Sequence, residues 1–560
     1  MNISLSPDGE FLVVKLKYHP DAVRAVKSVT GATYNPVKKL WTVPLPHVEE
    51  ALETLSRAGS TADPEVIAAA KKQKEKRLEL QAIKNGAKKD GAEVFSADNI
   101  ARGDISDLPL FNFQKIGCDF LWSATAALLA DEPGLGKTIQ TIAALSGPSF
   151  SRNLVLCPAT LKYNWQEEIK KWRPNELAAV VSGSPKKRQE FWKKPAKWII
   201  ANYELLIKDI DIIRRIPWTA IVCDEATRIS NPRAKSVKAL KWILCPKKIA
   251  LTGTPISNSP IDLWSIADWL RPGFLGSYWQ FLESYTIRDR WNNIVGYKNL
   301  GVLAQKIEPL TLRRVKEEVL TDFPNKTRED VVFSLSAPEL KVYESVKTRL
   351  LEEIRPLLSK IDTRSLALIP VKMLRLKQIT GHLRLIGEGE RSSKLEVLKQ
   401  LLEPILKSGE KALIFTQFAE MAKILYEELK NFHPFLIYGE VEQAERQARV
   451  NAFSAFAGPA VMIMTEAGAY GLNLQAAPYV FHYDLPWSVA KLTQREDRAH
   501  RIGQTKPVTV YNLVARHTID EYVSKVLHKK QKISSDILQD AERLEKSGLA
   551  ADDVKAILGL

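Results

Sequence analysis

The chain has 560 residues, of which 45% are apolar and 26% charged; this is an ordinary globular composition but too long for one hydrophobic core, so roughly three or four domains are expected. The excess of 81 Lys and Arg over 65 Asp and Glu gives a formal net charge of +16, which favours nucleic acid over an acidic protein or a membrane surface, with solvated lysines as the plain alternative. The four cysteines lack paired or metal-ligand spacing, which argues against a disulfide framework and a zinc site. No apolar run approaches ~18 residues, which argues against a membrane span. Together these features predict an intracellular protein.

Residues 1–58 are predicted to form a small separate module of the β-α-β-α type. Its strands are expected at 11–16 and 40–43, and its helices at 20–29 and 47–55. The composition then changes, and residues 59–105 are predicted to be a linker. The charged run at 71–77 within it is typical of a solvated helix or of a disordered segment.

Three short motifs stand out in the N-terminal module: Tyr18-His19-Pro20, Tyr34-Asn35-Pro36 and Lys39-Leu40-Trp41. Together they resemble the HARP module of annealing helicases. In that family the module helps to bind and position DNA, so the resemblance implies DNA contacts from Tyr34, Trp41 and the nearby lysines. A single aromatic residue on a strand is also a common core residue, and this alternative stays open for Trp41.

From residue 106 onward, short β-branched runs alternate with helical patterns, which is typical of an α/β fold with parallel sheets and crossover helices. Strands are expected at 153–157, 198–201, 220–223 and 248–251, and then at 412–415, 435–438, 461–464, 480–483 and 508–513. Residues 256–390 lack strand alternation and are expected to be mainly helical. The predicted domains are a first lobe at 106–330 with a helical insertion from about 256, a helical linker at 331–390, a second lobe at 391–530 and a helical tail at 531–560. Ligands of such sheets bind at the carboxyl ends of the strands.

The segment Asp131-Glu132-Pro133-Gly134-Leu135-Gly136-Lys137-Thr138 follows an apolar run and opens a helical pattern. A glycine-rich turn at a helix start leaves backbone N–H groups available for phosphate, and the helix dipole adds positive charge there. In a phosphate-binding loop, Lys137 would reach the β- and γ-phosphates of ATP and Thr138 would ligate Mg²⁺, with Asp131, Gly134 and Gly136 in the cradle. The strict pattern has glycine where this chain has Asp131.

Two further strand ends place polar residues at the same edge of the first sheet. Asp224 and Glu225 follow the strand at 220–223. Asp224 would hold Mg²⁺ through water, and Glu225 would orient the water that attacks the γ-phosphate. Thr252 and Thr254 follow the strand at 248–251, where their hydroxyls would bond the catalytic carboxylates. Because an Asp-Glu pair and a Gly-Pro turn are each common, the interpretation depends on their place beside the phosphate loop.

Near the end of the second lobe, Gln494, Arg498 and Arg501 are spaced i, i+4 and i+7, which predicts one shared face of a helix. Two guanidinium groups on one stripe suit bidentate recognition of a transition-state phosphate. Because they belong to the second lobe, they would act only when the lobes close, which makes hydrolysis conditional on closure. The alternative is a salt-bridged helix, since Glu496 and Asp497 lie between them.

Further motifs follow one another in order: Phe113-Gln114, Cys157-Pro158-Ala159-Thr160-Leu161, Asn202-Tyr203-Glu204, Leu312-Arg313-Arg314-Val315-Lys316, Ser392-Ser393-Lys394-Leu395, Phe415-Thr416-Gln417-Phe418, Gly471-Leu472-Asn473-Leu474 and the run from Arg498 to Gln504. Over residues 108–530 this series resembles the Swi/Snf-type ATPases of helicase superfamily two. The resemblance implies two tandem RecA-like lobes, ATP and Mg²⁺ as cofactors, and DNA as the partner. It implies nucleotide contacts from Gln114, Gly471 and Gln494. The DNA contacts that it implies are Thr160, Lys162, Tyr203, Gln417, Thr465 and Asn473.

Three residues depart from the family pattern: Thr227 stands in place of His, Pro133 in place of Met and Ala469 in place of Gly. None of these changes removes a catalytic charge. We therefore predict a DNA-dependent ATPase that acts as a motor on duplex or branched DNA, without sequence preference, and that anneals or remodels this DNA. The motor is expected to be a monomer with no membrane partner. Its expected location is the nucleoid in the cytoplasm, or the nucleus. The alternatives are an RNA or strand-separating helicase of the same superfamily and a non-hydrolysing scaffold bound to DNA.

Overall fold

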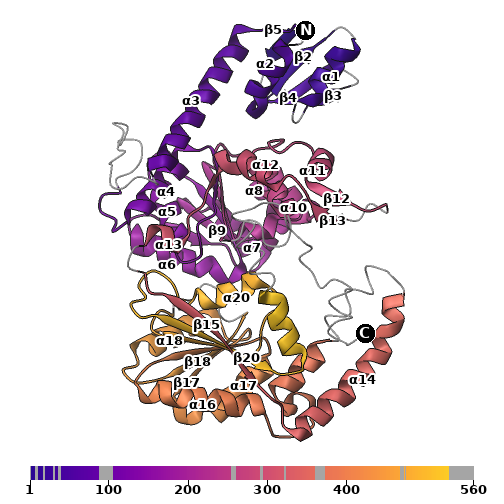
Figure 1. Cartoon of the computed structure of the whole chain (residues 1–560). Helices are drawn as coiled ribbons and strands as arrows, with labels where there is room; N and C mark the ends of the chain where they lie inside the picture. Colours follow the sequence, from indigo (N-terminus) through magenta and orange to yellow (C-terminus); the bar gives the residue numbers. More distant parts are fainter. Residues whose placement is uncertain are drawn as a thin grey trace. The chain divides into compact units, whose positions relative to one another are not determined.

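The computed structural model describes residues 2–6, 11–16, 19–29, 32–35, 39–57, 59–86, 105–253, 260–290, 294–320, 323–359, 373–466, 472 and 474–528. Contacts between residues divide the chain into two compact units, and the division falls between Val315 and Lys316. The first unit contains an N-terminal sheet, a seven-stranded sheet and a two-stranded hairpin, and the second unit contains a six-stranded sheet (Figure 1).

The N-terminal module is built on a five-stranded sheet with the strand order β3-β4-β2-β1-β5. Its elements are β1 (Asn2–Leu5), β2 (Phe11–Lys15), α1 (Pro20–Ser28), β3 (Thr33–Asn35), β4 (Leu40–Pro44), α2 (Val48–Ser56) and β5 (Thr61–Ala62). The two predicted strands and two predicted helices are confirmed. Strands β1, β3 and β5 were not predicted, because they have only 4, 3 and 2 residues and so carry little periodicity.

Trp41 belongs to the core of this module. Its side chain is only 9% exposed, and it packs with Leu12, Val14 and Val43. The predicted DNA contact of Trp41 is therefore corrected in favour of the core alternative. Tyr34, whose ring centroid lies 5.2 Å from that of Trp41, is 50% exposed.

Helix α3 (Pro64–Gly86) occupies the beginning of the predicted linker and has 23 residues. Val66 near its start is buried in the core of the N-terminal module, whereas Leu80 and Ile83 near its end pack against the core of the seven-stranded sheet. Lys84 Nζ lies 3.3 Å from Glu308 Oε1. The helix therefore connects two cores within the first unit (Figure 1).

The seven-stranded sheet is parallel throughout and has the order β14-β6-β11-β10-β7-β9-β8. Its strands are β6 (Ala126–Leu129), β7 (Asn153–Cys157), β8 (Ala178–Val180), β9 (Trp198–Asn202), β10 (Ala220–Asp224), β11 (Lys248–Leu251) and β14 (Thr311–Leu312). Because helices cover both faces, the strands are apolar on both sides. In β7, Leu154 and Leu156 join one buried cluster, and Val155 and Cys157 join the other.

Helices from consecutive crossovers bury the two clusters. The cluster that contains Val155 is covered by α4 (Asn112–Ser123), α5 (Lys137–Ala144) and α6 (Lys162–Trp172). The cluster that contains Leu154 is covered by α7 (Pro185–Lys193), α8 (Tyr203–Ile213), α9 (Lys235–Lys241), α10 (Pro260–Leu270), α11 (Tyr278–Tyr285) and α12 (Leu300–Ile307). The predicted helical insertion after residue 256 therefore thickens one face of this sheet.

The second unit has a parallel six-stranded sheet with the order β15-β20-β19-β16-β18-β17. Its strands are β15 (Lys326–Phe333), β16 (Ala412–Thr416), β17 (Pro434–Ile437), β18 (Val461–Thr465), β19 (Tyr479–His482) and β20 (Val508–Ala515). The helices include α13 (Lys316–Val319), α14 (Ala337–Ser359), α16 (Ser393–Lys407), α17 (Ala419–Glu428), α18 (Gln443–Ala455) and α20 (Val489–Glu496), and a further helix covers residues 519–528. Two tandem α/β sheets with a small N-terminal module confirm the predicted fold class.

Among the described residues, four strands lie inside the range predicted to be mainly helical, and one of them is β14 of the seven-stranded sheet. Residues 286–297 hold the hairpin of β12 (Thr286–Arg288) and β13 (Ile294–Tyr297). Strand β15 pairs along all its length with β20 and forms one edge of the second sheet. Its sequence, Lys-Thr-Arg-Glu-Asp-Val-Val-Phe, begins with charged residues that an edge strand tolerates and that hide it from a search for apolar alternation.

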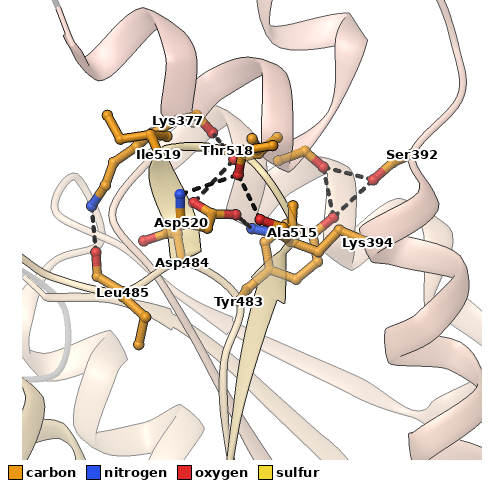
Figure 2. A network of polar contacts seen from close by, with 12 residues as sticks. Lys377, Ser392, Lys394, Tyr483, Asp484, Leu485, Ala515, Thr518, Ile519 and Asp520 are labelled. Atoms are coloured by element: carbon orange, nitrogen blue, oxygen red, sulfur yellow. Dashed lines mark hydrogen bonds and ion pairs between the residues drawn. The ribbon is translucent and has the colours of Figure 1, made fainter. Parts of the chain in front are cut away.

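A buried polar network ties the helix at 519–528 to α16 and to the helix at 373–381 (Figure 2). Lys394 Nζ donates to Asp520 Oδ2, and Thr380 Oγ1 donates to Asp520 Oδ1 over 3.2 Å. Lys377 Nζ donates to the carbonyl of Leu485, and burial lowers the pKa of this lysine to about 8. This network fixes the chain that follows β19 and β20 without involving the phosphate loop.

Three of the four cysteines, Cys118, Cys157 and Cys223, are buried free thiols as predicted, and Cys245 is partly buried. Burial raises the pKa of the Cys157 and Cys223 thiols. Within the described residues, no helix is long and apolar enough to span a membrane, and no group of three or more His, Cys, Asp or Glu could hold a metal ion.

Candidate active site

The phosphate loop lies between β6 and α5, as predicted. Gly136 caps the start of α5 with φ of 76°, a left-handed conformation that favours glycine. A Cβ atom on Gly136 would lie 2.5 Å from Gln114 Nε2, so the loop also lacks room for a side chain there. The backbone N–H groups at the start of α5 are therefore held where an anion binds.

Lys137 begins α5 and folds back over its own loop. Its Nζ donates to the carbonyls of Asp131, at 2.7 Å, and Glu132, at 3.3 Å. Thr138 follows it, partly buried. The lysine and the threonine thus lie at the helix start where phosphate and its cation are expected.

Asp131 has a different role from the one predicted. Its carboxylate is completely buried and accepts hydrogen bonds from Arg314 Nε, at 2.9 Å, and from Gln140 Nε2, at 3.2 Å. Arg314 Nη2 also donates to Gln140 Oε1 over 2.8 Å. The predicted nucleotide contact of Asp131 is therefore corrected: the side chain anchors the loop, which explains why a carboxylate replaces the glycine of the strict pattern. Sequence reasoning missed Arg314 and Gln140 in this role.

Gln114 lies against the loop from α4. Its Nε2 donates to the carbonyl of Leu135 over 3.2 Å, and its Oε1 accepts from Phe111 N at 3.1 Å. Gly117, one turn later, leaves room for the Arg314 contacts, because a Cβ there would lie 1.7 Å from Gln140 Oε1 and 2.8 Å from Arg314 Nη2. These contacts give Gln114 and Gly117 a part in the shape of the loop.

Asp224 and Glu225 end β10, and β11 alone separates β10 from β6 in the sheet. Trp165 Nε1 donates to Asp224 Oδ2 over 2.8 Å. Burial, and then the negative charge of Glu225, raise the pKa of Asp224 to about 6. Glu225 has a positive φ of 49°, a strained conformation for a residue with a Cβ. The predicted position of this pair at the edge that carries the phosphate loop is confirmed.

Thr252 follows β11 between these two segments and is buried, and its N–H donates to the carbonyl of Leu129 at 3.2 Å. A Cβ on Gly253 would lie 2.5 Å from Pro133 Cγ in the phosphate loop. This turn therefore packs directly against the loop. Thr254, the second predicted hydroxyl, lies outside the described residues.

The predicted DNA contacts of the first unit differ in accessibility. Thr160 is partly buried after β7. Lys162 Nζ donates to the carbonyl of Val181 over 3.0 Å, and burial lowers its pKa. Tyr203 is only 5% exposed, and its hydroxyl donates to the carbonyl of Asp224 over 2.7 Å. Tyr203 is thus corrected from a DNA contact to a residue that holds the backbone of Asp224.

In the second unit, Gln417 follows β16, and Thr465 is the last residue of the neighbouring strand β18. Gln417 N donates to Asp484 Oδ1 over 2.8 Å, and its side-chain Nε2 donates to the carbonyl of Leu485 over 2.8 Å. Thr465 is only 5% exposed. Asn473 and Gly471, predicted to contact DNA and nucleotide, lie outside the described residues.

The two arginines do not share a helical face, which corrects the prediction. Helix α20 ends at Glu496, so partly buried Gln494 is helical, whereas Arg498 and Arg501 lie in the turn that follows. The carboxylates of Glu496 and Asp497 are buried at this helix end, and cations from distant parts of the chain bind them. Lys326 Nζ and Arg328 Nη2 lie 2.9 and 2.6 Å from Glu496 Oε2, and Lys316 Nζ lies 2.6 Å from Asp497 Oδ1. We call residues 497–501 the arginine turn.

Residues 56–385 match the family profile described as "SNF2-related domain", and residues 393–503 match "Helicase conserved C-terminal domain". An uncharacterized ATP-dependent helicase of Mycoplasma pneumoniae is 33% identical over 78% of this chain and 43% of its own. A putative ATP-dependent helicase/translocase of Bacillus subtilis is 34% identical over 80% of this chain and 51% of its own. The chain thus spans about half the length of these curated relatives or less.

Among solved structures, the SWI2/SNF2 ATPase core of Sulfolobus solfataricus in complex with dsDNA is 30% identical, covers 82% of this chain and 98% of its own, and has a TM-score of 0.38. The SNF2-related profile extends over more than half of the chain, and the helicase profile follows it. This chain therefore belongs to the SNF2-related family.

Proposed function

We propose that this chain is a DNA-dependent ATPase that moves along duplex DNA and couples each hydrolysis to the closing and opening of its two lobes. One observation carries the proposal: β6, β11 and β10 are neighbours, and they end in the phosphate loop, in Thr252 and in the Asp224–Glu225 pair. This edge holds the ammonium group of Lys137, the N-terminus of α5 and two carboxylates, the groups that phosphoryl transfer needs.

The residues at this edge fit a magnesium-bound ATP. Burial and Glu225 disfavour the charged form of Asp224, and a divalent cation would stabilise it. Bound Mg²⁺ supplies charge neutralisation for the phosphates. Lys137 would exchange its loop carbonyls for phosphate oxygens, Thr138 and Asp224 would hold the cation, and Glu225 would orient the attacking water.

The arginine turn is proposed to complete the site on closure. Arg498 and Arg501 would stabilise the negative charge of the transition state, which makes turnover depend on the movement of the second lobe. The buried ion pairs of Glu496 and Asp497 support this role, because they give the turn a fixed backbone.

DNA is the proposed partner because the chain carries a net charge of +16 and the motifs around Thr160 and Thr465 follow strand ends. Contacts to backbone phosphates carry no sequence information, so binding would be non-specific and would weaken steeply with salt. The exposed Tyr34 of the N-terminal module supports the finer proposal that the motor anneals strands or remodels branched DNA in the manner of HARP-type annealing helicases. A monomer working in the cytoplasm or nucleus would suffice for this activity.

The test is the rate of phosphate release with ATP in the presence of duplex DNA, single-stranded DNA, forked DNA or RNA, each over a range of salt. We expect duplex or forked DNA to stimulate turnover most, and the stimulation to fall as salt rises. Strongest stimulation by RNA would favour an RNA helicase instead. No phosphate release with any ligand would favour the non-hydrolysing scaffold.

A further inference from the structure

The chain passes from the first unit to the second through Val315, and the basic residues on either side of it are buried. Arg314 is 4% exposed and Lys316 is 2% exposed. Buried cations are costly unless they are paired, and each of these is paired inside its own unit.

Arg314 is bound to the phosphate loop by both its backbone and its side chain. Its carbonyl accepts a hydrogen bond from Glu132 N at 2.9 Å, and its guanidinium group donates to Asp131 and Gln140. Two residues earlier, at the end of β14, the carbonyl of Leu312 accepts from Ala130 N at 2.7 Å. The last residues of the first unit therefore run beside the loop and are attached to it at several points.

Lys316 makes the corresponding attachment in the second unit. Its Nζ donates to Asp497 Oδ1 over 2.6 Å and to the carbonyl of His500 over 2.7 Å. These acceptors lie at the beginning and near the end of the arginine turn, on either side of Arg498 and just before Arg501. A single ammonium group thus holds the backbone of the segment that presents both arginines.

We propose that Arg314 and Lys316 are positioning residues that connect the junction at Val315 to the two halves of the ATPase site. Any rotation of the chain about Val315 acts on the phosphate loop through Arg314 and on the arginine turn through Lys316. The inference rests on the proposed function, in which the arginine turn acts on a nucleotide held by the first unit.

The test replaces both partners of each ion pair, Lys316–Asp497 and Arg314–Asp131, by apolar side chains. Removal of one partner alone would leave a buried charge that destabilises the unit. The variants are Lys316→Met with Asp497→Leu, and Arg314→Met with Asp131→Leu. The chain offers a matched control for each. Lys394→Met with Asp520→Leu removes a buried Lys–Asp pair of the second unit (Figure 2), and Arg188→Met with Asp209→Leu removes a bidentate Arg–Asp pair of the first unit.

Three quantities are measured in the full chain: the thermal unfolding transition, the Kd of a fluorescent ATP analogue without turnover, and kcat with and without duplex DNA. We expect the Lys316/Asp497 variant to unfold like its control and to bind the analogue normally, yet to lose DNA-stimulated kcat by at least about tenfold, because small misplacements of a catalytic group are costly. We expect the Arg314/Asp131 variant to bind the analogue at least about tenfold more weakly than its control.

The outcomes separate this inference from the proposed function. If the Lys316/Asp497 variant keeps the DNA-stimulated kcat of its control, the pair serves only the fold and the inference is overturned. Equal loss in variant and control overturns it as well, because the effect then belongs to any buried pair. If the unmodified chain shows no stimulation by DNA, the proposed function itself fails.

Discussion

Among single residues, Glu225 is the one whose chemistry is easiest to isolate. It follows β10 in a strained left-handed conformation beside Asp224, and the proposed function has it orient the attacking water. We expect Glu225→Gln to lower ATP turnover by about 10²–10⁴-fold, the usual worth of general acid–base catalysis, while Kd for ATP and DNA change little. Glu190→Gln, at an exposed position of α7, is the control. Wild-type turnover in the Glu225 variant would contradict the assignment, as it would in Lys137→Ala, which should also abolish turnover.

Arg501 tests whether the second unit contributes charge to the reaction. Because it belongs to the arginine turn, its proposed role is in the transition state and not in nucleotide binding. We expect Arg501→Ala to lower kcat by about 10³-fold, as loss of an arginine finger does, with little change in the affinity for ATP. Arg516→Ala, at an exposed position after β20, serves for comparison. An unchanged kcat would remove the arginine turn from the site.

Several residue roles could not be predicted because a motif does not show its partners. The pattern around Asp131 indicates a phosphate loop, but the partner of Asp131 is Arg314, 183 positions later in the chain. The aromatic residues Trp41 and Tyr203 belong to motifs that resemble DNA-contacting ones of known families, yet both are buried. Lys137, Asp224 and Glu225 were predictable because local sequence alone places them at strand ends and a helix start.

At the scale of elements, most strands rich in β-branched residues were predictable, whereas β6, which is buried but consists of Ala and Leu alone, and the edge strand β15 were not. Strands β7 and β11 have the predicted bounds, since their apolar runs are short and bounded by polar segments. Strand β15 was missed because its first five residues are polar or charged. The end of α20 was missed as well, because the sequence around Glu496 does not show that Lys316, Lys326 and Arg328, all distant in sequence, pair with the buried carboxylates of Glu496 and Asp497.

The arginine turn also contains His500, whose protonation should make the stability of the folded chain depend on pH. His500 Nε2 donates to the carbonyl of Pro324 over 2.8 Å. The pKa of His500 is lowered from 6.5 to about 4, chiefly by burial. The charges of Lys316 and Lys326 contribute to this lowering of the pKa, and the charge of Asp497 opposes it. Between these two values the unfolded chain binds the proton and the folded chain does not, so stability falls as pH falls from 6.5 towards 4.

We expect this single group to remove about 2 kcal/mol of unfolding free energy between pH 7 and pH 5, and His500→Gln to lack that part of the loss. The measurement is chemical denaturation of both proteins at the two pH values. His19→Gln, at an exposed histidine, should behave like the unmodified chain. An identical pH dependence in His500→Gln and the unmodified chain would show that the imidazole is not neutral in the folded state.

For the molecule as a whole, the open question is what the N-terminal module adds to the motor. Deletion of residues 1–58 should weaken annealing or branched-DNA activity more than basal ATPase, but the structure shows that this cut is not clean. It removes the partner strand of β5 and exposes Val66 of α3. His47 Nε2 also donates to the carbonyl of Gly273 over 2.8 Å, so the deletion disturbs a contact with the larger sheet's helical layer.

A point substitution avoids that difficulty, because Tyr34 is 50% exposed and the neighbouring Trp41, not Tyr34, belongs to the core of the module. Base–aromatic stacking is worth about 1–3 kcal/mol per base, so Tyr34→Ala should weaken binding of single strands by about 5- to 150-fold and lower the annealing rate. Basal ATPase activity should be unchanged, since the phosphate loop and the Asp224–Glu225 pair belong to the seven-stranded sheet and not to the N-terminal module. Phe11→Ala, at a second exposed ring of the module, is the matched control. Equal annealing rates in Tyr34→Ala, Phe11→Ala and the unmodified chain would leave the module with a structural role alone.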